Sequence, residues 1–480
     1  MNHGLPDWKS RRDFLQHCGL GLGSVALAQL LGAEGVLAES ANTVPRALNL
    51  HSRTGHFPSK AKAVIQLVQE GGPSQMDLFD PKPELSKRNG EKLPTKSVES
   101  FQKGSESQQL LGSPFQFRPR GESGMVLSEL LVHTGELADD LCLVRSMYSE
   151  NNNHPEAQQL FQTGKITPGR PTLGSWVSYG LGTESQDLPA YLVLLDPDGP
   201  PGNGSRLWDN GWLPALYRGT EFNSRGAAVH NLKPFVVSPA GVQHKSLELL
   251  AWLNQRHRRN YPQESELETR IRNYELAARM QMSAENVVDL STETEATRRM
   301  YGLDNPVTEG YGRRCLMARR LVEAGVRFVQ VFPGPGSPWD THSNNSNRVK
   351  ELCGMTDQPT AALITDLKNR GMLDDTIVIW AGEFGRLPIT QGKDGRDHNR
   401  HAFSLFLAGG GFKPGYSHGA TDELGYRAVE DRVSVPDFLA TILHQLGLDQ
   451  NRLTFRHHGV EETLTDAKVT KARVVQELLA

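Results

Sequence analysis

Three short apolar runs, each stopped by chain-breaking residues, set the strongest limit on what this 480-residue chain can fold into. The runs cover residues 63–68, 326–332 and 376–380, and each is followed by glycine, with proline after the first two. Strands that are apolar on nearly every residue are expected where helices cover both faces of a sheet. Helix-favouring stretches at about 316–323 and 359–370 precede two of the runs. The pattern predicts an α/β fold of three layers, αβα, with a mostly parallel central sheet.

Changes in residue composition along the chain indicate its domain organisation. We expect a signal peptide at 1–40, a linker at 41–60, the α/β domain at 61–470 and a C-terminal tail at 471–480. Segment 175–310 is Gly- and Pro-rich at first and then polar and helix-favouring. It is interpreted as a helical insertion or cap that shapes a cleft, with a solvated structural elaboration as the alternative.

The first forty residues have the form of an export signal. Ser10-Arg11-Arg12-Asp13-Phe14-Leu15 precedes a weakly apolar run over 18–31, and Val36-Leu37-Ala38 offers small residues for cleavage. The run is shorter than the roughly 20 apolar residues that span a bilayer, so no stable membrane anchor is expected. The alternative is an amphipathic N-terminal helix. The pattern predicts twin-arginine export to the periplasm or beyond, and because that route carries folded proteins, it favours a metal loaded beforehand.

Charge and cysteine content exclude some classes of function. The chain has 52 basic and 55 acidic residues, a net charge of -3, and no long basic run, so nucleic acid is not an expected partner. Cys142, Cys315 and Cys353 would remain after cleavage, which is no disulfide framework. Core burial must therefore hold the fold together.

Acidic and histidine side chains gather just beyond the predicted strands. Asp340 and His342 follow the second run, Glu383 follows the third, and Asp397 and His398 lie in a loop before the next strand. Open parallel sheets place their ligands at such strand ends. Taken singly, each pair is more typical of a cap or a surface hydrogen bond. Together they predict a divalent metal site, and mixed carboxylate and imidazole ligands suit zinc or manganese better than calcium.

The order of four motifs resembles a known family. Gly-Gly-Pro-Ser-Gln-Met-Asp, Trp-Asp-Thr-His, Gly-Glu-Phe-Gly-Arg and Gly-Arg-Asp-His-Asn follow one another as in an uncharacterised family of exported sulfatase-like proteins, a domain of unknown function. That family looks like a remote branch of the alkaline phosphatase superfamily, which implies an alkaline phosphatase- or sulfatase-like fold. By position, the resemblance implies metal ligation by Asp340, His342, Glu383 and His398. Phe384 stands where the superfamily has a histidine, which implies a single-ion or rearranged site.

The resemblance also suggests further site residues, with open alternatives. His154, nine residues before Thr163-Gly164, aligns with the nucleophile position, so it is a nucleophile, a metal ligand or a histidine hydrogen-bonded at a helix start. Asp77 matches the first metal-binding Asp, with Glu70 as its rival. Two further residues, Arg386 and Arg396, are expected to clamp phosphate or sulfate, or else to form surface salt bridges.

These observations together predict an exported metal-dependent hydrolase of phosphate or sulfate esters, acting on a small molecule or a glycan. The alternative is a sulfatase-like protein without catalysis that binds sulfated polysaccharide or a protein partner. A structural metal is the third reading. The sequence leaves the oligomeric state open.

Overall fold

The computed structural model describes residues 49–93, 98–225, 242–261 and 265–480. Contacts divide the chain into Met1–Leu48 and Asn49–Ala480, and only the second unit is described. The predicted export signal lies outside the described residues. No helix among the described residues is both long enough and apolar enough to cross a bilayer.

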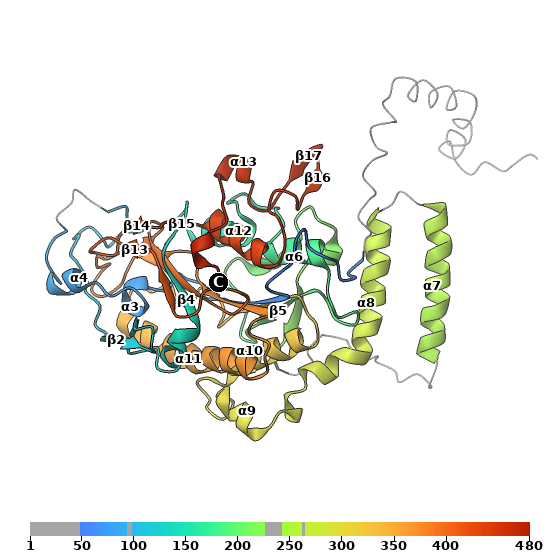
Figure 1. Ribbon diagram of the computed structural model, residues 1–480, viewed down its shortest axis with the longest axis horizontal. Helices are drawn as coiled ribbons and strands as arrows, with labels where there is room; N and C mark the ends of the chain where they lie inside the picture. The colour runs from blue at the N-terminus through green and yellow to red at the C-terminus, as the bar shows by residue number, and fades with distance from the viewer. Residues whose placement is uncertain (1–48, 94–97, 226–241, 262–264) are drawn as a thin grey trace, which may run out of the picture. The chain divides into compact units, whose positions relative to one another are not determined.

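A nine-stranded sheet forms the centre of the fold (Figure 1). Its order is β12-β4-β11-β8-β1-β7-β5-β6, with β15 added beside β4. Strand β11 runs antiparallel to both of its neighbours, and the other pairings are parallel. The mostly parallel α/β sheet is therefore confirmed. The strands are β1 (Ala63–Val68), β4 (Leu141–Tyr148), β5 (Tyr191–Leu195), β6 (Thr220–Asn223), β7 (Phe328–Val331), β8 (Thr376–Ala381), β11 (Phe403–Ala408), β12 (Tyr416–His418) and β15 (Val433–Ser434).

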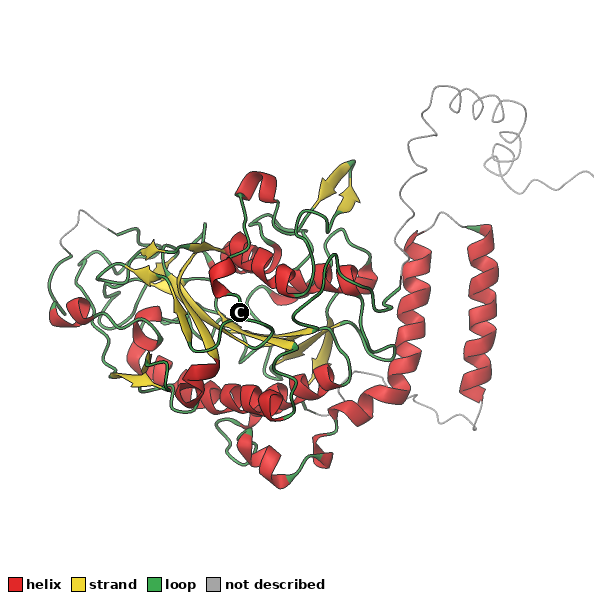
Figure 2. Cartoon of the chain, viewed as in Figure 1, coloured by secondary structure: helices red, strands yellow, loops and turns green. Residues whose placement is uncertain are grey.

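Helices cover both faces of this sheet, as the continuous apolar strands predict (Figure 2). Alternate residues of β1 point into two separate hydrophobic cores. Ile65 belongs to the core that contains Leu316 and Leu363 of one helical layer. Val64 belongs to the core that contains Trp176 of the other helical layer. The first layer contains α10 (Glu309–Glu323) and α11 (Asn345–Asn369). The second contains α5 (His154–Thr163), α6 (Leu173–Leu181) and α12 (Val435–Gln445).

Segment 175–310 is only partly an insertion. Strands β5 and β6 lie within it and extend the central sheet beside β7, because their apolar residues continue the same core. The helical part consists of α7 (Val242–Asn260), α8 (Ser265–Val288) and α9 (Glu295–Met300). The last ten residues, expected as a tail, pack on the domain: Leu478 is buried and the Ala480 amide donates to Gly411 O at 3.0 Å.

Short elements complete the described chain. They are α3 (Gln75–Leu78), α4 (Pro83–Lys87), α13 (Ala467–Thr470), β2 (Phe117–Arg120), β3 (Met125–Ser128), β9 (Gly385–Arg386), β10 (His398–Asn399), β13 (Ala420–Thr421), β14 (Ala428–Glu430), β16 (Phe455–His457), β17 (Val460–Glu462) and the 3-10 turns Thr134–Asp140, Gly204–Trp208, Ala215–Tyr217, Leu290–Thr292 and Gln476–Leu478.

The sheet register decides where the polar loops meet. Leu67 of β1 pairs with Val331 of β7 and Trp380 of β8, so the carboxyl ends of all three strands lie at one edge. The loops that leave these strands therefore start side by side, although they are far apart in sequence.

Candidate metal centre

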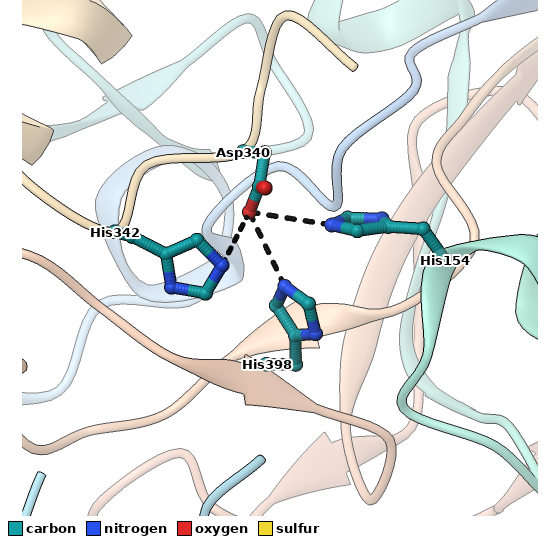
Figure 3. A group of neighbouring side chains, drawn as sticks. All are labelled: His154, Asp340, His342 and His398. Carbon is teal, nitrogen blue, oxygen red and sulfur yellow. Dashed lines mark hydrogen bonds and ion pairs between the residues drawn. The ribbon is translucent and has the colours of Figure 1, made fainter. Parts of the chain in front are cut away.

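Three histidines and one aspartate meet at this edge of the sheet. One ligand atom from each of His154, Asp340, His342 and His398 lies within 4.8 Å of all the others. Asp340 Oδ1 is 3.3 Å from His154 Nε2, 3.0 Å from His342 Nε2 and 3.2 Å from His398 Nε2. The three rings point at this oxygen from different directions (Figure 3). The structure thus brings together four of the residues singled out in the sequence.

Separate loops supply these four side chains. Asp340 and His342 leave the sheet after β7, and His154 is the first residue of α5, which follows β4. His398 lies in β10, whose two residues pair with β9 just beyond β8 in the register His398 to Arg386. The small β9-β10 ladder therefore returns the chain to the strand ends and sets the third imidazole against the other two.

Each imidazole is held from behind by an oxygen acceptor at Nδ1. His154 Nδ1 is 2.6 Å from Glu383 Oε1, and His342 Nδ1 is 2.5 Å from Gln391 Oε1. His398 Nδ1 is 2.7 Å from the backbone oxygen of Asn152. These partners assign the hydrogen of a neutral ring to Nδ1, which leaves the Nε2 lone pair facing the centre.

The donor set at the centre fits a divalent transition-metal ion. Three lone pairs directed at an anionic oxygen repel it unless a cation lies between them. If the rings were donors instead, Asp340 Oδ1 would receive three of them and also Arg386 Nη2 at 2.7 Å, more than its lone pairs can accept. Imidazole nitrogen with one carboxylate oxygen is a ligand set of zinc and related metals.

Electrostatics at the centre also favour a cation. Burial opposes charge on His154, but hydrogen bonds that its ring donates to the Asp340 and Glu383 carboxylates outweigh this effect and raise the pKa of His154 to about 9. Burial lowers the pKa of His398 to about 4. Burial also acts to raise the pKa of Asp340, yet the three histidines and the Arg386 charge hold it well below its usual range. The surroundings thus keep a carboxylate ionised and one further positive charge beside it.

Glu383, predicted as a strand-end ligand, lies behind His154 and does not face the centre. Its carboxylate accepts from the Gly71 amide at 3.0 and 3.2 Å and from Gln158 Nε2 at 3.3 Å. Its remaining contact is the one to His154 Nδ1. Phe384, where the superfamily has a histidine, packs its ring against His154 and His398, with centroids 4.8 and 4.6 Å away. Glu383 therefore orients His154, and its oxygens are engaged by Gly71, Gln158 and His154.

Asp77 and Arg396 form a closed ion pair away from the centre. Both side chains are fully buried, and two bonds of 2.9 and 3.1 Å join them. Asn345 Nδ2 donates to the same carboxylate at 2.9 Å. Burial acts to raise the pKa of Asp77, but Arg396 and the hydrogen bonds hold it below its ordinary value. The remaining Arg396 donors reach backbone oxygens, among them Leu111 O at 2.9 Å. These partners join Asp77 and Arg396 to each other and to the surrounding chain, and Asp77 is not among the four converging side chains.

Arg386 is likewise buried and engaged with the protein. It donates to Gly72 O at 2.9 Å, to Arg396 O at 3.0 Å, to Gly71 O, and to Asp340 Oδ1 at 2.7 Å. Its donors therefore orient Asp340, and the predicted direct grip on a substrate anion is not what the geometry shows.

Asp397, predicted among the ligands, anchors a loop. It accepts from the amides of Phe101 and Gln102 at 2.7 and 2.8 Å and from the His398 amide at 2.8 Å. The loop in turn reaches the centre: the Phe101 ring stacks on His398 at 5.0 Å, and Gln102 Nε2 lies 3.0 Å from His342 Nε2. Sequence reasoning missed Phe101, Gln102, Gln391 and Asn152, and no pattern in their loops marks them.

Glu70, the rival of Asp77 at the end of β1, is also outside the centre. It is fully buried, and neither carboxylate oxygen has a hydrogen-bond partner among the described residues. Burial, with a smaller effect of the Glu383 charge, raises the pKa of Glu70 well above its usual value. Burial therefore favours the protonated form of the Glu70 side chain.

Comparison with known proteins identifies a matching family. The family described as "Protein of unknown function (DUF1501)" matches residues 61–479. No curated protein matches significantly. Solved structures that overlap with the fold include the lipoteichoic acid synthase LtaP from Listeria monocytogenes, at 9% identity and TM-score 0.35 over 84% of this chain and 76% of that one.

Two other solved structures overlap to a similar degree. The PsFucS1 sulfatase from Pseudoalteromonas sp. has 12% identity and a TM-score of 0.34 over 81% of this chain and 68% of its own. A mutant of TAB5 alkaline phosphatase with magnesium bound has 10% identity and a TM-score of 0.34 over 82% of this chain and 99% of its own. At these identities and TM-scores the overlap carries no information on a reaction.

Proposed function

We propose that this chain, which belongs to the family described as "Protein of unknown function (DUF1501)", is a metal-dependent hydrolase of phosphate or sulfate esters. One observation carries the proposal: the Nε2 atoms of His154, His342 and His398 converge with an Asp340 oxygen, and each ring is fixed by an oxygen acceptor at Nδ1. Outer partners of this kind set the tautomer and orientation of metal-ligating histidines.

The ion that suits these ligands is zinc or manganese. Three imidazoles and one carboxylate are too rich in nitrogen for calcium, which takes oxygen ligands. A divalent ion at this position would supply Lewis acidity and lower the pKa of a water molecule. His154, His342, His398 and Asp340 would hold it, while Glu383 and Arg386 keep two of these ligands in place.

His154 acts in this proposal as a ligand and not as a covalent nucleophile. Its Nδ1 is occupied by Glu383, and its Nε2 faces the shared centre. Residues 150–158, which include the first turns of α5, contain no hydroxyl or thiol side chain. Water is therefore the nucleophile that the site can offer. This is the reason for expecting direct hydrolysis rather than a covalent intermediate.

The charges around the centre favour an anionic ester. Arg386 and a divalent ion together carry one more positive charge than Asp340 and Glu383 carry negative charge, with the histidines neutral. The ten-residue helix α5 also begins at the centre, so its positive end faces the same space. Side-chain exposure is 26% for Asp340 and 22% for His342 but 1% for His398, so a substrate approaches from the first two.

The absence of a side-chain nucleophile in residues 150–158 also supports the second candidate, a sulfatase-like protein that binds sulfated polysaccharide or a protein partner without turnover. The two candidates share the metal and differ only in whether an ester is cleaved. Both would lose ligand affinity when the centre loses its ion.

One experiment separates the candidates. The purified full chain is loaded with zinc or manganese, its bound metal is measured by elemental analysis, and it is assayed with aryl phosphate, phosphodiester and aryl sulfate esters. Wild type is compared with His342→Ala and with the control His457→Ala, a histidine in β16 outside the centre. Turnover that His342→Ala loses and His457→Ala keeps supports the hydrolase. Stoichiometric metal without turnover on any ester supports the binding protein, and no metal contradicts both.

Export through the twin-arginine route is part of the proposal and rests on the sequence of residues 10–15. The test is export of the full chain in a bacterium with an intact twin-arginine system, compared with a variant in which Arg11 and Arg12 are both lysine. The proposal requires the wild-type chain outside the cytoplasm and the double variant retained inside. Equal export of the two would overturn this route.

A further inference from the structure

Helix α7 exposes a set of large apolar side chains. Exposure is 58% for Leu249, 55% for Trp252, 46% for Leu253 and 45% for Val242. Single exposed apolar residues are ordinary, but a cluster on one element marks an interaction surface. These four residues, called the α7 apolar face below, lie in a region with no part in the metal centre.

The α7 apolar face is a true face of the helix. At about 100° per residue, Val242, Leu249 and Leu253 fall almost on one line and Trp252 lies beside them. The half-buried residues of α7 are on the other side, where Arg258 forms an ion pair with Glu268 of α8 at 2.9 Å. Figure 1 shows α7 lying alongside α8. Pairing with α8 thus uses one side of α7 and leaves the apolar side uncovered.

Basic side chains lie on the same uncovered face. On the helical projection Lys245 and Arg256 lie between Trp252 and Leu249, and Arg259 and then Glu248 lie beyond Trp252. The guanidinium of Arg256 lies 5.9 Å from the Trp252 ring centroid. An exposed helix face that combines tryptophan and leucine with lysine and arginine, whose long side chains can carry their charge to the headgroups, has the composition of helices that lie in a bilayer interface.

We propose that α7 docks on the surface of a bilayer that contains anionic lipids. Its apolar face enters at the level of the headgroups, while Lys245, Arg256 and Arg259 pair with lipid phosphates. A second copy of the chain fits less well, because face-to-face contact would bring these like charges together. Apolar residues also do not recur over the three to four heptads, roughly, that a coiled coil requires. The docking is independent of the reaction at the metal centre.

The test is co-sedimentation of the purified full chain with vesicles. One set contains phosphatidylcholine alone, and the other contains phosphatidylcholine with phosphatidylglycerol. Wild type is compared with the double variant Leu249→Ser and Leu253→Ser, with Arg256→Gln and Arg259→Gln, and with the control Tyr274→Ser. Tyr274 is 70% exposed on α8, outside the α7 apolar face. All proteins carry the same residues 1–48, so differences between them report on the helices.

The proposal expects binding to the anionic vesicles that falls at least about tenfold in each double variant and in high salt, and stays unchanged in Tyr274→Ser. All the changed residues are exposed, and unchanged melting temperatures will show that the variants are folded. Equal binding of wild type and the leucine variant, or binding that does not need phosphatidylglycerol, would overturn it. A dimer in solution that dissociates in the leucine variant would overturn it in favour of a second copy.

Discussion

Two ionic clusters lie near the same sheet edge and differ in how their donors and acceptors match. In the buried Asp77–Arg396 pair every donor meets an oxygen, and neither side chain is exposed. In the His154–Asp340–His342–His398 centre four groups face one another with lone pairs and charge unbalanced, and Asp340 keeps 26% of its side chain exposed. Both clusters contain the residue types that the sequence singles out.

The difference teaches how to tell a structural ion pair from a binding centre. A cluster whose hydrogen bonds are complete gains nothing from a ligand and loses stability when one member is removed. A cluster whose members converge without completing each other's bonds is stabilised when a cation enters. Variants of the two clusters should therefore affect different measurements.

The largest effect is expected from Asp77→Asn. The variant leaves the buried Arg396 charge without a counter-charge, so the free energy of unfolding should fall by about 3–5 kcal/mol. Urea unfolding at neutral pH measures this free energy. Glu351→Gln is the control, because loss of the exposed Arg348–Glu351 ion pair should lower the free energy of unfolding by less than about 1 kcal/mol. Equal stability of the two variants would show that the buried pair is not structural.

Asp340→Asn should act on metal affinity instead. The change keeps the shape of the side chain but removes the only carboxylate of the centre, so we expect affinity for zinc to fall by more than about a hundredfold, beyond the effect of outer partners. Competition with a chromophoric chelator measures the change. Unaltered affinity would mean that the ion, if bound, lies elsewhere.

Glu383 should show an intermediate effect, because it acts through His154. Glu383→Gln keeps an oxygen acceptor for His154 Nδ1 but no charge, whereas Glu383→Ala removes both. Metal affinity should fall about 10- to 100-fold in the alanine variant and less in the glutamine variant. The matched control is Glu156→Gln, in the first turn of α5. A larger loss in Glu383 variants than in Asp340→Asn would make Glu383 a direct ligand.

Lowering the pH should remove the contribution of the Asp77–Arg396 ion pair to the free energy of unfolding. The folded-state pKa of Asp77 lies below its unfolded value, so its stabilisation is full above the unfolded pKa of about 3.9 and is lost as pH falls through the folded value. The stability gap between wild type and Asp77→Asn should thus be constant from pH 7 to about 5 and narrow below about 4. Unfolding curves across this range measure it, and a gap that widens on acidification would reverse the assignment.

Strand patterns gave the fold, and the reason is physical. Apolar runs such as 63–68 require cover on both faces, and the glycines that stop them place the following loops at one edge. Asp340, His342 and His398 could be named because they directly follow such runs or lie in the next loop. The sequence predicts an insertion where β5 and β6 lie, because Gly- and Pro-rich segments surround these two short strands and obscure their strand pattern.

The role of each site residue could not be predicted from the sequence and follows only from the three-dimensional structure. Asp77 and Arg396 carry the right chemistry for a ligand and an anion clamp, and only the distance of 2.9 Å between them shows that each satisfies the other. Glu383 follows its strand as a ligand should, but the Gly71 amide and His154 take its oxygens. Partners hundreds of residues away decide such matters, and no local pattern in the sequence records them.

The smallest effect is expected at Gln102, and its sign is informative. Its amide nitrogen lies 3.0 Å from His342 Nε2, the same lone pair that a metal would need, so the amide competes with the ion. Because a hydrogen bond of this kind contributes about 0.5–1.5 kcal/mol, Gln102→Ala should raise metal affinity by roughly two- to tenfold. Lys103→Ala is the control, since its backbone oxygen, not its side chain, bonds Gln391. Chelator competition measures both variants.

If Gln102→Ala instead lowers metal affinity tenfold, the Gln102 side-chain oxygen faces the ion and is a further ligand. The centre would then gain a ligand from a loop, whereas the Asp77–Arg396 pair has no room for one.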